Sequence, residues 1–171
     1  MRGAHPKRAG FTLIELLVAL TIAAIMMGFA IPAFTDFVQQ RRMASDGNQF
    51  IVAVNYARSE AARRGGIVTL QTIDASDSDD EWGPGFCVTA NDPGNCNAAL
   101  AMFTLEGDEF TMDALDLLND EDSLSFDGRG LIQDGLRGEI RLCGEDANDD
   151  PGRSIQINAI GRAQITRDDC F

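Results

Sequence analysis

The stretch FTLIELLVALTIAAIMMGFAIPAF, residues 11–34, decides the fold of this 171-residue chain. Glu15 is the only charged residue in it. An apolar run of this length can cross the roughly 30 Å hydrocarbon layer of a bilayer as a helix. We therefore predict a transmembrane segment over 11–34.

The flanks of this segment set its orientation. Residues 1–10, MRGAHPKRAG, contain three basic side chains, and no similar cluster follows until Arg41 and Arg42. Basic flanks stay on the cytoplasmic side, so we predict a single-pass inner-membrane protein with a cytoplasmic N-terminus. A secretory signal peptide also has a basic and then an apolar region, but residues 31–34 offer no small-residue cleavage site.

Glu15 is the unusual member of the segment, because a carboxylate inside a membrane-spanning helix costs at least ~2.5 kcal/mol and usually has a function. We expect another group to compensate its charge. The alternative is a glutamate that extends to the membrane interface and stays hydrated there.

The run Gly10-Phe11-Thr12-Leu13-Ile14-Glu15, after a short basic leader and before an apolar helix, resembles the prepilin motif of type IV pilins and type II secretion pseudopilins. The resemblance implies that prepilin peptidase removes residues 1–10 by cutting after Gly10, and then methylates the amine of Phe11. Glu15 would neutralise that amine on a neighbouring subunit. Pro32 stands where the family commonly has a helix-bending proline.

The helix should continue beyond the membrane through an amphipathic half, 35–66. Four residues at spacings of four, three and four define an apolar stripe that faces the head: Phe50, Val54, Ala57 and Ala61. Arg63 and Arg64 suit the negative end of the helix dipole, and Gly65-Gly66 supplies a stop. We predict a helix from about Thr12 to Arg64.

After Gly66 the pattern changes to short β-branched segments separated by Gly, Pro, Asn and Asp, which predicts an antiparallel, β-rich head over 67–171. The predicted strands are 67–73, 85–90, 98–104, 123–126, 139–143, 154–158 and 163–166. The fold class is α+β, with one long N-terminal helix packed on a small β-rich head.

Four cysteines lie after the apolar segment: Cys87, Cys96, Cys143 and Cys170. An even number outside the cytoplasm favours two disulfides. Three pairings are possible, and we favour Cys87 with Cys96 across a turn and Cys143 with Cys170 at the C-terminus. Reduced thiols or a metal site are the alternative, although no C-x-x-C spacing supports zinc.

Scattered patches of the head resemble the FimT/GspH-type minor pilins and pseudopilins: Trp82-Gly83-x-Gly85-Phe86, Phe126-Asp127-x-x-Gly130, Ile140-x-Leu142-Cys143, and Arg153-Ser154-Ile155-x-Ile157-Asn158 before Gly161-Arg162. This implies a minor pilin that initiates or joins a type IV pilus, with other pilins and membrane lipid as its partners. The alternative is pseudopilin H of the type II secretion system. A third reading is a membrane-anchored binding module that never polymerises.

Charge argues against nucleic acid as a partner. Residues 1–66 carry eight Lys or Arg against four acids, whereas 67–171 carry six Arg against 23 acids, a net charge of −17. Such a head repels phosphate. Some relatives bind DNA through Gly-Arg-x-Arg, but Gln164 replaces the second arginine here, so Arg162 and Arg167 are weak DNA candidates.

Calcium binding and catalysis both have little support in the sequence. The spacing Asp146-x-Asn148-x-Asp150 is that of the start of a calcium loop, but Pro151 occupies the turn position that needs glycine. Catalysis is not expected, because the only histidine, His5, lies in the leader. We expect no cofactor and no metal.

Overall fold

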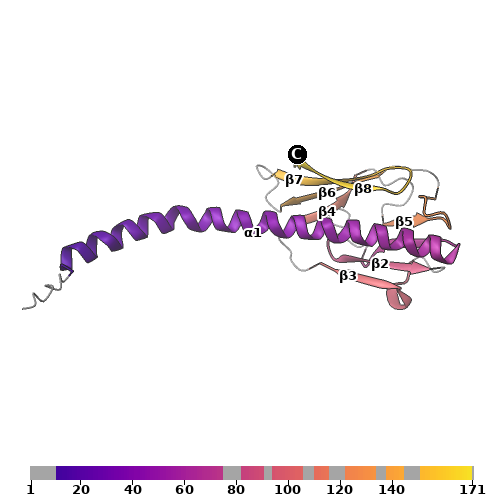
Figure 1. Cartoon of the computed structure of the whole chain (residues 1–171), viewed down its shortest axis with the longest axis horizontal. Helices are drawn as coiled ribbons and strands as arrows, with labels where there is room; N and C mark the ends of the chain where they lie inside the picture. The colour runs from indigo at the N-terminus through magenta and orange to yellow at the C-terminus, as the bar shows by residue number, and fades with distance from the viewer. Residues whose placement is uncertain are drawn as a thin grey trace, which may run out of the picture. The chain divides into compact units, whose positions relative to one another are not determined.

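The computed structural model describes residues 11–74, 82–90, 94–105, 110–115, 122–133, 138–144 and 151–170 (Figure 1). The chain divides into two compact units, Met1–Gln40 and Arg41–Phe171, and we call the second unit the head. Helix α1 (Leu13–Arg64) contributes to both units. Calcium candidates Asp146, Asn148 and Asp150 lie outside the described residues.

Helix α1 ends where the sequence predicts. Gly65 adopts a positive φ of 64°, and the N–H groups of Gly65 and Gly66 both donate to the carbonyl of Ala61, at 2.9 and 3.3 Å. A glycine with positive φ after the last turn, with its N–H turned back onto the helix, satisfies carbonyls that the helix leaves open. The predicted C-terminal stop is confirmed.

Two four-stranded antiparallel sheets complete the head. Sheet A has the order β3-β2-β1-β5, made of β3 (Ala101–Thr104), β2 (Gly85–Ala90), β1 (Val68–Thr72) and β5 (Ser123–Phe126). Sheet B has the order β4-β6-β7-β8, made of β4 (Phe110–Ala114), β6 (Gly138–Gly144), β7 (Pro151–Ile157) and β8 (Ala163–Asp169). The predicted α+β class is confirmed.

The strand prediction missed one strand and was wrong in several bounds. The strand predicted over 154–158 begins three residues earlier, at Pro151, and the one predicted over 163–166 ends three residues later, at Asp169. Strand β4 was not predicted, because Phe110–Ala114 is a short edge segment with a charged residue, Asp113, that pairs only with β6. The strand predicted from position 98 begins at Ala101 instead, after a 3-10 turn over Cys96–Ala98. Asn95 caps that turn, since its side-chain oxygen accepts the N–H of Asn97 at 2.9 Å.

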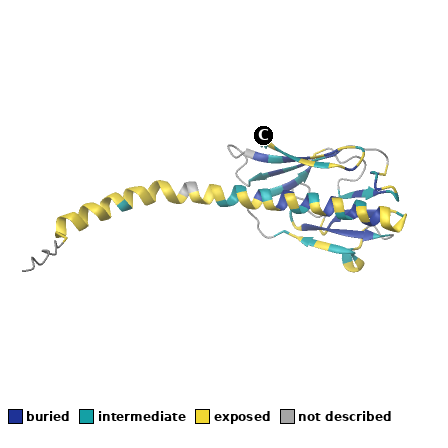
Figure 2. Ribbon diagram, viewed as in Figure 1, coloured by how far each residue is buried: buried dark blue, intermediate teal, exposed yellow. Residues whose placement is uncertain are grey.

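The core of the head lies between α1 and the sheets. The predicted stripe is confirmed, since its four members are fully buried: Phe50, Val54, Ala57 and Ala61. The Phe50 ring meets Trp82 and Phe86 edge-on, with both centroid distances at 5.3 Å. Gly47 gives the helix room beside sheet B, because a Cβ there would lie against Ile165. Figure 2 shows buried and exposed residues alternating along the end of α1 that belongs to the head.

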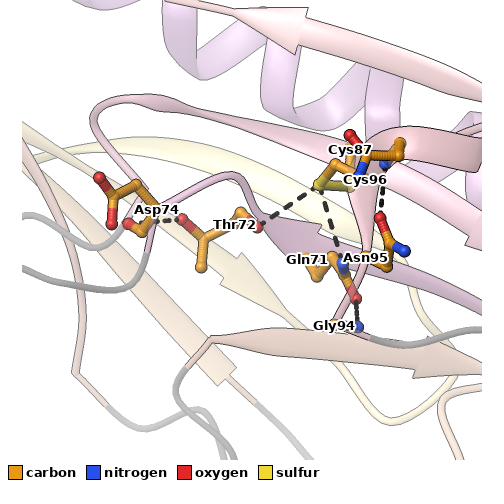
Figure 3. Close-up of a disulfide and its surroundings, with 8 residues drawn as sticks. Gln71, Thr72, Asp74, Cys87, Gly94, Asn95 and Cys96 are labelled. Carbon is orange, nitrogen blue, oxygen red and sulfur yellow. Dashed lines mark hydrogen bonds between the residues drawn. A yellow bond between two sulfur atoms is a disulfide. The ribbon is translucent and has the colours of Figure 1, made fainter.

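The first disulfide joins Cys87 of β2 to Cys96 of the 3-10 turn, as predicted. Figure 3 shows how Gln71 of β1, directly opposite Cys87, holds the connecting segment. The Gln71 side chain accepts the N–H of Gly94 at 2.6 Å and donates to the Cys96 sulfur at 3.7 Å. The disulfide and Gln71 together fasten this segment to sheet A.

The second disulfide joins Cys143 at the end of β6 to Cys170 after β8, also as predicted. Strand β7 lies between β6 and β8 in the sheet, so the bridge passes over it. Gly152 makes this possible, because a Cβ there would meet the Cys170 sulfur and lie 2.7 Å from the Leu142 carbonyl oxygen. The disulfide therefore depends on a residue without a side chain beneath it.

A carboxylate organises the last turn of α1. Glu60 accepts hydrogen bonds from Arg63 Nε and Nη2 at 2.9 and 2.6 Å and from Arg64 Nε at 2.9 Å. These bonds lower the pKa of Glu60 from its ordinary 4.5 to about 2. Glu60 is thus ionised in the folded head at neutral pH.

We predict that Gly152→Ala destabilises the head, because the added methyl group forces the disulfide or the β6 backbone to move. Overpacking of this kind typically costs about 1–3 kcal/mol. Denaturant unfolding of the detergent-solubilised full chain, followed by the fluorescence of the buried Trp82, measures the loss. Gly66→Ala is the matched control, since a Cβ there meets nothing within 4 Å. Equal stability of the two variants would contradict the packing described.

We predict that the stabilisation by Glu60 depends on pH. A carboxylate whose pKa falls on folding stabilises the folded state fully above its unfolded value, and this contribution disappears as the pH falls through the folded value. The Tm difference between wild type and Glu60→Gln should be full above about pH 4.5 and vanish towards pH 2. A difference that stays constant down to pH 2 would argue against the arginine contacts.

Candidate functional site

The start of α1 is capped by a residue that sequence reasoning missed. Thr12 precedes the helix, and its hydroxyl oxygen lies 3.3 Å from the N–H of Glu15, which donates to it. The Thr12 carbonyl accepts the N–H of Leu16 at 3.2 Å. Thr12-x-x-Glu15 has the spacing of a capping box, and this spacing was the available signal. Glu15 therefore occupies a fixed place in the first turn.

The described part of the first unit is apolar around its whole circumference. Figure 2 shows this stretch almost entirely in the exposed colour. Its exposed large apolar side chains are Phe11, Leu13, Ile14, Leu16, Leu17, Val18, Leu20, Ile22, Ile25, Met26, Met27, Phe29, Ile31, Phe34 and Phe37. Leu13 is 81% exposed. A helix that is apolar all round belongs in hydrocarbon or in a protein core. By length and composition α1 is able to cross a membrane.

Polar groups within this stretch are few and satisfied locally. The hydroxyl of Thr21 donates to the carbonyl of Val18 at 2.8 Å, so this donor is satisfied within the helix. Local hydrogen bonding to the backbone is how such hydroxyls are accommodated in hydrocarbon.

Glu15 has no cation within reach on its own helix. Between 11 and 40 the only charged residues are Glu15 and Asp36, and the positions one turn away are Phe11, Thr12, Val18 and Ala19. Neighbours at these spacings are the ones a helical side chain can pair with. No residue at these helical spacings can therefore compensate the charge of Glu15.

Pro32 lies within α1, which continues without a break from Leu13 to Arg64. Its side chain is outside the described residues, as are the leader and Gly10. The predicted bend at Pro32 and the predicted cleavage after Gly10 stay predictions.

The two weak DNA candidates are not brought together. Arg162 lies in the turn before β8, where its backbone N–H donates to the side-chain oxygen of Asn158 at 2.9 Å. Arg167 lies five residues further along, opposite Arg153 of β7. Five residues of strand span roughly 16 Å, so Arg162 and Arg167 do not form one basic spot.

No metal site is evident in the part of the chain that the structure describes, where no group of three or more His, Cys, Asp or Glu side chains converges. All four cysteines are in disulfides. The described residues thus offer an exposed apolar helical segment with the carboxylate of Glu15 near its start, and a head closed by two disulfides.

Two family descriptions match the chain. Residues 46–161 match the family described as "Type II transport protein GspH", and residues 5–31 match the prokaryotic N-terminal methylation motif. The type IV major fimbrial protein FimA of Dichelobacter nodosus is 32% identical over 65 residues, which are 35% of this chain and 41% of FimA. In this match the chain spans about two fifths of the relative's length.

Solved structures share the fold. A crystal structure of the type IV minor pilin FimU of Pseudomonas aeruginosa is 21% identical, with a TM-score of 0.64 over 79% of this chain and 99% of FimU. The minor pseudopilin EpsH of the type 2 secretion system of Vibrio cholerae is 10% identical, with a TM-score of 0.52 over 74% of this chain and 97% of EpsH. These similarities show a common fold.

Proposed function

The chain belongs to the family described as type II transport protein GspH, and on this premise we propose that it initiates or joins a type IV pilus as a minor pilin. Pilins and pseudopilins are structural proteins, and the chain is not an enzyme. It is a minor pilin or pseudopilin of a type IV pilus or a type II secretion system.

Processing is the first step of the proposal. The methylation motif matched over 5–31 includes Gly10 and Phe11. Prepilin peptidase cuts after Gly10, and Phe11 then carries the new N-terminal amine, which is methylated. This amine stands at the positive end of the α1 dipole, one turn before Glu15, in an apolar stretch without another cation.

The observation that carries the proposal is Glu15, which has no cation at pairing distance along the described part of α1. An amine and a carboxylate about 4 Å apart attract each other by roughly 4 kcal/mol at an effective dielectric constant of 20. Because the hydrocarbon layer excludes water, water does not compete for either charged group. The amine of Phe11 on one subunit therefore pairs with Glu15 of a neighbour already in the filament. The exposed apolar residues of both helices pack around this pair and exclude lipid.

The proposed location of the chain follows from the apolar half of α1 and its basic leader. Before assembly, the apolar half of α1 holds the chain in the inner membrane, with the leader on the cytoplasmic side and the head in the periplasm. Two disulfides suit that oxidising compartment. After assembly, the head lies on the surface of the pilus.

A pseudopilin in the type II secretion system is the second candidate. The printed family description and the fold shared with EpsH favour it. The higher TM-score with FimU, 0.64 against 0.52, favours the pilus. Pilus-tip DNA binding has less support, because Arg162 and Arg167 lie apart and Gln164 replaces the second arginine.

We predict that Glu15→Ala reaches the membrane but is nearly absent from filaments. An uncharged helix inserts more readily, by about 2.5 kcal/mol, yet it cannot pair with an incoming amine. Quantitative mass spectrometry gives the amount of the chain in sheared filaments relative to that in membranes. We expect this ratio to fall at least about tenfold. Asp36→Ala is the matched control, because it removes the other exposed carboxylate of the same unit.

A normal filament ratio for Glu15→Ala would refute assembly through Glu15 and favour a membrane-anchored module that does not polymerise. Cells that lack this chain distinguish the type IV pilus from the type II secretion system. Loss of surface pili without this chain indicates the pilus, whereas intact pili with blocked exoprotein release indicate secretion.

We predict that Gly10→Val leaves the leader attached, because a β-branched side chain at the cleavage position obstructs the peptidase. Intact-mass measurement of the membrane protein should show the unprocessed chain without a methyl group. Gly3→Val changes another leader glycine in the same way and should be processed normally. Normal removal of residues 1–10 from Gly10→Val would contradict the proposed cleavage position.

A further inference from the structure

The basic residues of the chain differ in kind on the two sides of the proposed cleavage position. The leader contains the only lysine and the only histidine of the sequence, Lys7 and His5. In 11–171 all eleven basic side chains are arginines. A chain that begins at Phe11 therefore has a single amine, the α-amine of Phe11 itself.

The other ionisable side chains of 11–171 belong to classes that keep their charge around neutral pH. Guanidinium groups stay protonated up to about pH 12, carboxyl groups titrate at about pH 4 and a phenol at about pH 10. All four cysteines are in disulfides and have no thiol proton to lose. An α-amine titrates at about pH 7.7–8.0. The amine of Phe11 is thus the group that changes charge between about pH 7 and pH 9.

One carboxylate of the head is held in an unusual environment, because burial raises the pKa of Asp46. Asp46 is 6% exposed, and it accepts a hydrogen bond from Gln49 Nε2 at 3.1 Å. This bond and the positive charge of Arg42 act in the opposite direction. Asp46 lies about eight helical turns from Glu15, so Asp46→Asn removes it without altering the start of α1.

The start of α1 presents the amine of Phe11 to a neighbouring molecule. Phe11 is 78% exposed and precedes the first helical turn, which Thr12 caps. All residues in 11–22 are exposed except one of intermediate exposure, so no described segment of the chain covers them. Glu15 and Asp36 are the charged side chains of 11–40. Glu15, one turn from the amine, is therefore the charged group that this amine meets, on its own chain or on a neighbour.

We propose that the α-amine of Phe11 is a charge switch for assembly, whose deprotonation in an alkaline medium ends its pairing with Glu15 of a neighbouring copy while the arginines and carboxylates keep their charge. The inference rests on the proposed function, since the amine is free only after cleavage. Methylation does not abolish the switch, because a methylated amine remains basic. A carboxylate beside a neutral amine in hydrocarbon is left without a compensating charge.

The direction and size of the effect follow from the protonation of the amine. The charged form is the one that pairs, so association is complete at lower pH and is lost as the pH rises. For an ordinary α-amine, about 90% is charged at pH 7 and about 10% at pH 9. The association of two copies should therefore weaken about tenfold between these two pH values.

Photo-cross-linking of the full chain in isolated host membranes tests the switch. A benzophenone amino acid replaces Ile22, which is 53% exposed, and two epitope tags on co-expressed copies identify a covalent dimer. A proton-conducting ionophore gives both membrane faces the same pH. We expect the dimer yield to fall about tenfold from pH 7 to pH 9 and to recover when the pH returns to 7.

Two variants and one spectroscopic measurement control for other titrating groups. Glu15→Gln keeps the amine but removes its charged partner, so its dimer yield should be low and equal at pH 7 and pH 9. Asp46→Asn should respond to pH as the wild type does. The fluorescence of Trp82 in the detergent-solubilised chain should stay constant over the same range. A fall in Glu15→Gln like that of the wild type, or loss of the response in Asp46→Asn, would overturn the inference.

Acetylation provides a second readout, because the processed chain has one amine. Acetic anhydride should add a single acetyl group by intact mass, and the uncharged product should give at pH 7 the low dimer yield that the untreated chain gives at pH 9. An unchanged yield after acetylation would overturn the charge switch.

The same measurements separate this inference from the proposed function. Equal dimer yields for wild type and Glu15→Gln at pH 7 would remove the pairing that the proposed function requires. A yield that depends on Glu15 but is the same at pH 7 and pH 9 would overturn the charge switch alone and retain assembly through Glu15.

Discussion

The structure depends on one continuous set of backbone hydrogen bonds in helix α1, which must serve two different surroundings. Over its first turns every side is exposed and apolar, so hydrocarbon or neighbouring helices are the only favourable environment. Over 41–64 only one stripe is apolar, and that stripe forms the centre of the head core. A helix satisfies its own backbone in both settings, which no strand or loop could do across a membrane.

The folded head must be stabilised against repulsion between its own negative charges. A net charge of −17 over 67–171 favours expansion of the chain. Two devices oppose it: a core in which Phe50, Trp82 and Phe86 interlock, and two disulfides that restrict the unfolded chain. The second disulfide also fixes the C-terminal end of β8 across β7, so the edge strand of sheet B cannot separate easily.

Much of this could be predicted from the sequence, because the strongest signals are local. The apolar stripe, the Gly65 stop and both favoured cysteine pairings were confirmed. Residue spacing identifies the helix face and the helix end, and the turn between Cys87 and Cys96 favoured the first pairing. Strand β4 could not be predicted, since Phe110–Ala114 becomes a strand only by pairing with β6. The role of Gly152 was also hidden, because it depends on a disulfide formed by residues of two other segments.

In the candidate site, too, the features with a local sequence signal could be predicted and those that depend on folding could not. Glu15 was evident from sequence because a charge in an apolar run has no structural explanation, whereas the Thr12 cap required attention to the hydroxyl and its spacing. The hydrogen bond between Arg58 and the Gly130 carbonyl could not be predicted, since the two residues are far apart in the sequence and meet only after folding. Glu60 adds a constraint, because its carboxylate holds the side chains of Arg63 and Arg64 at the last turn of α1. Because its pKa falls to about 2, the Glu60 carboxylate stays ionised and keeps these contacts at neutral and mildly acidic pH.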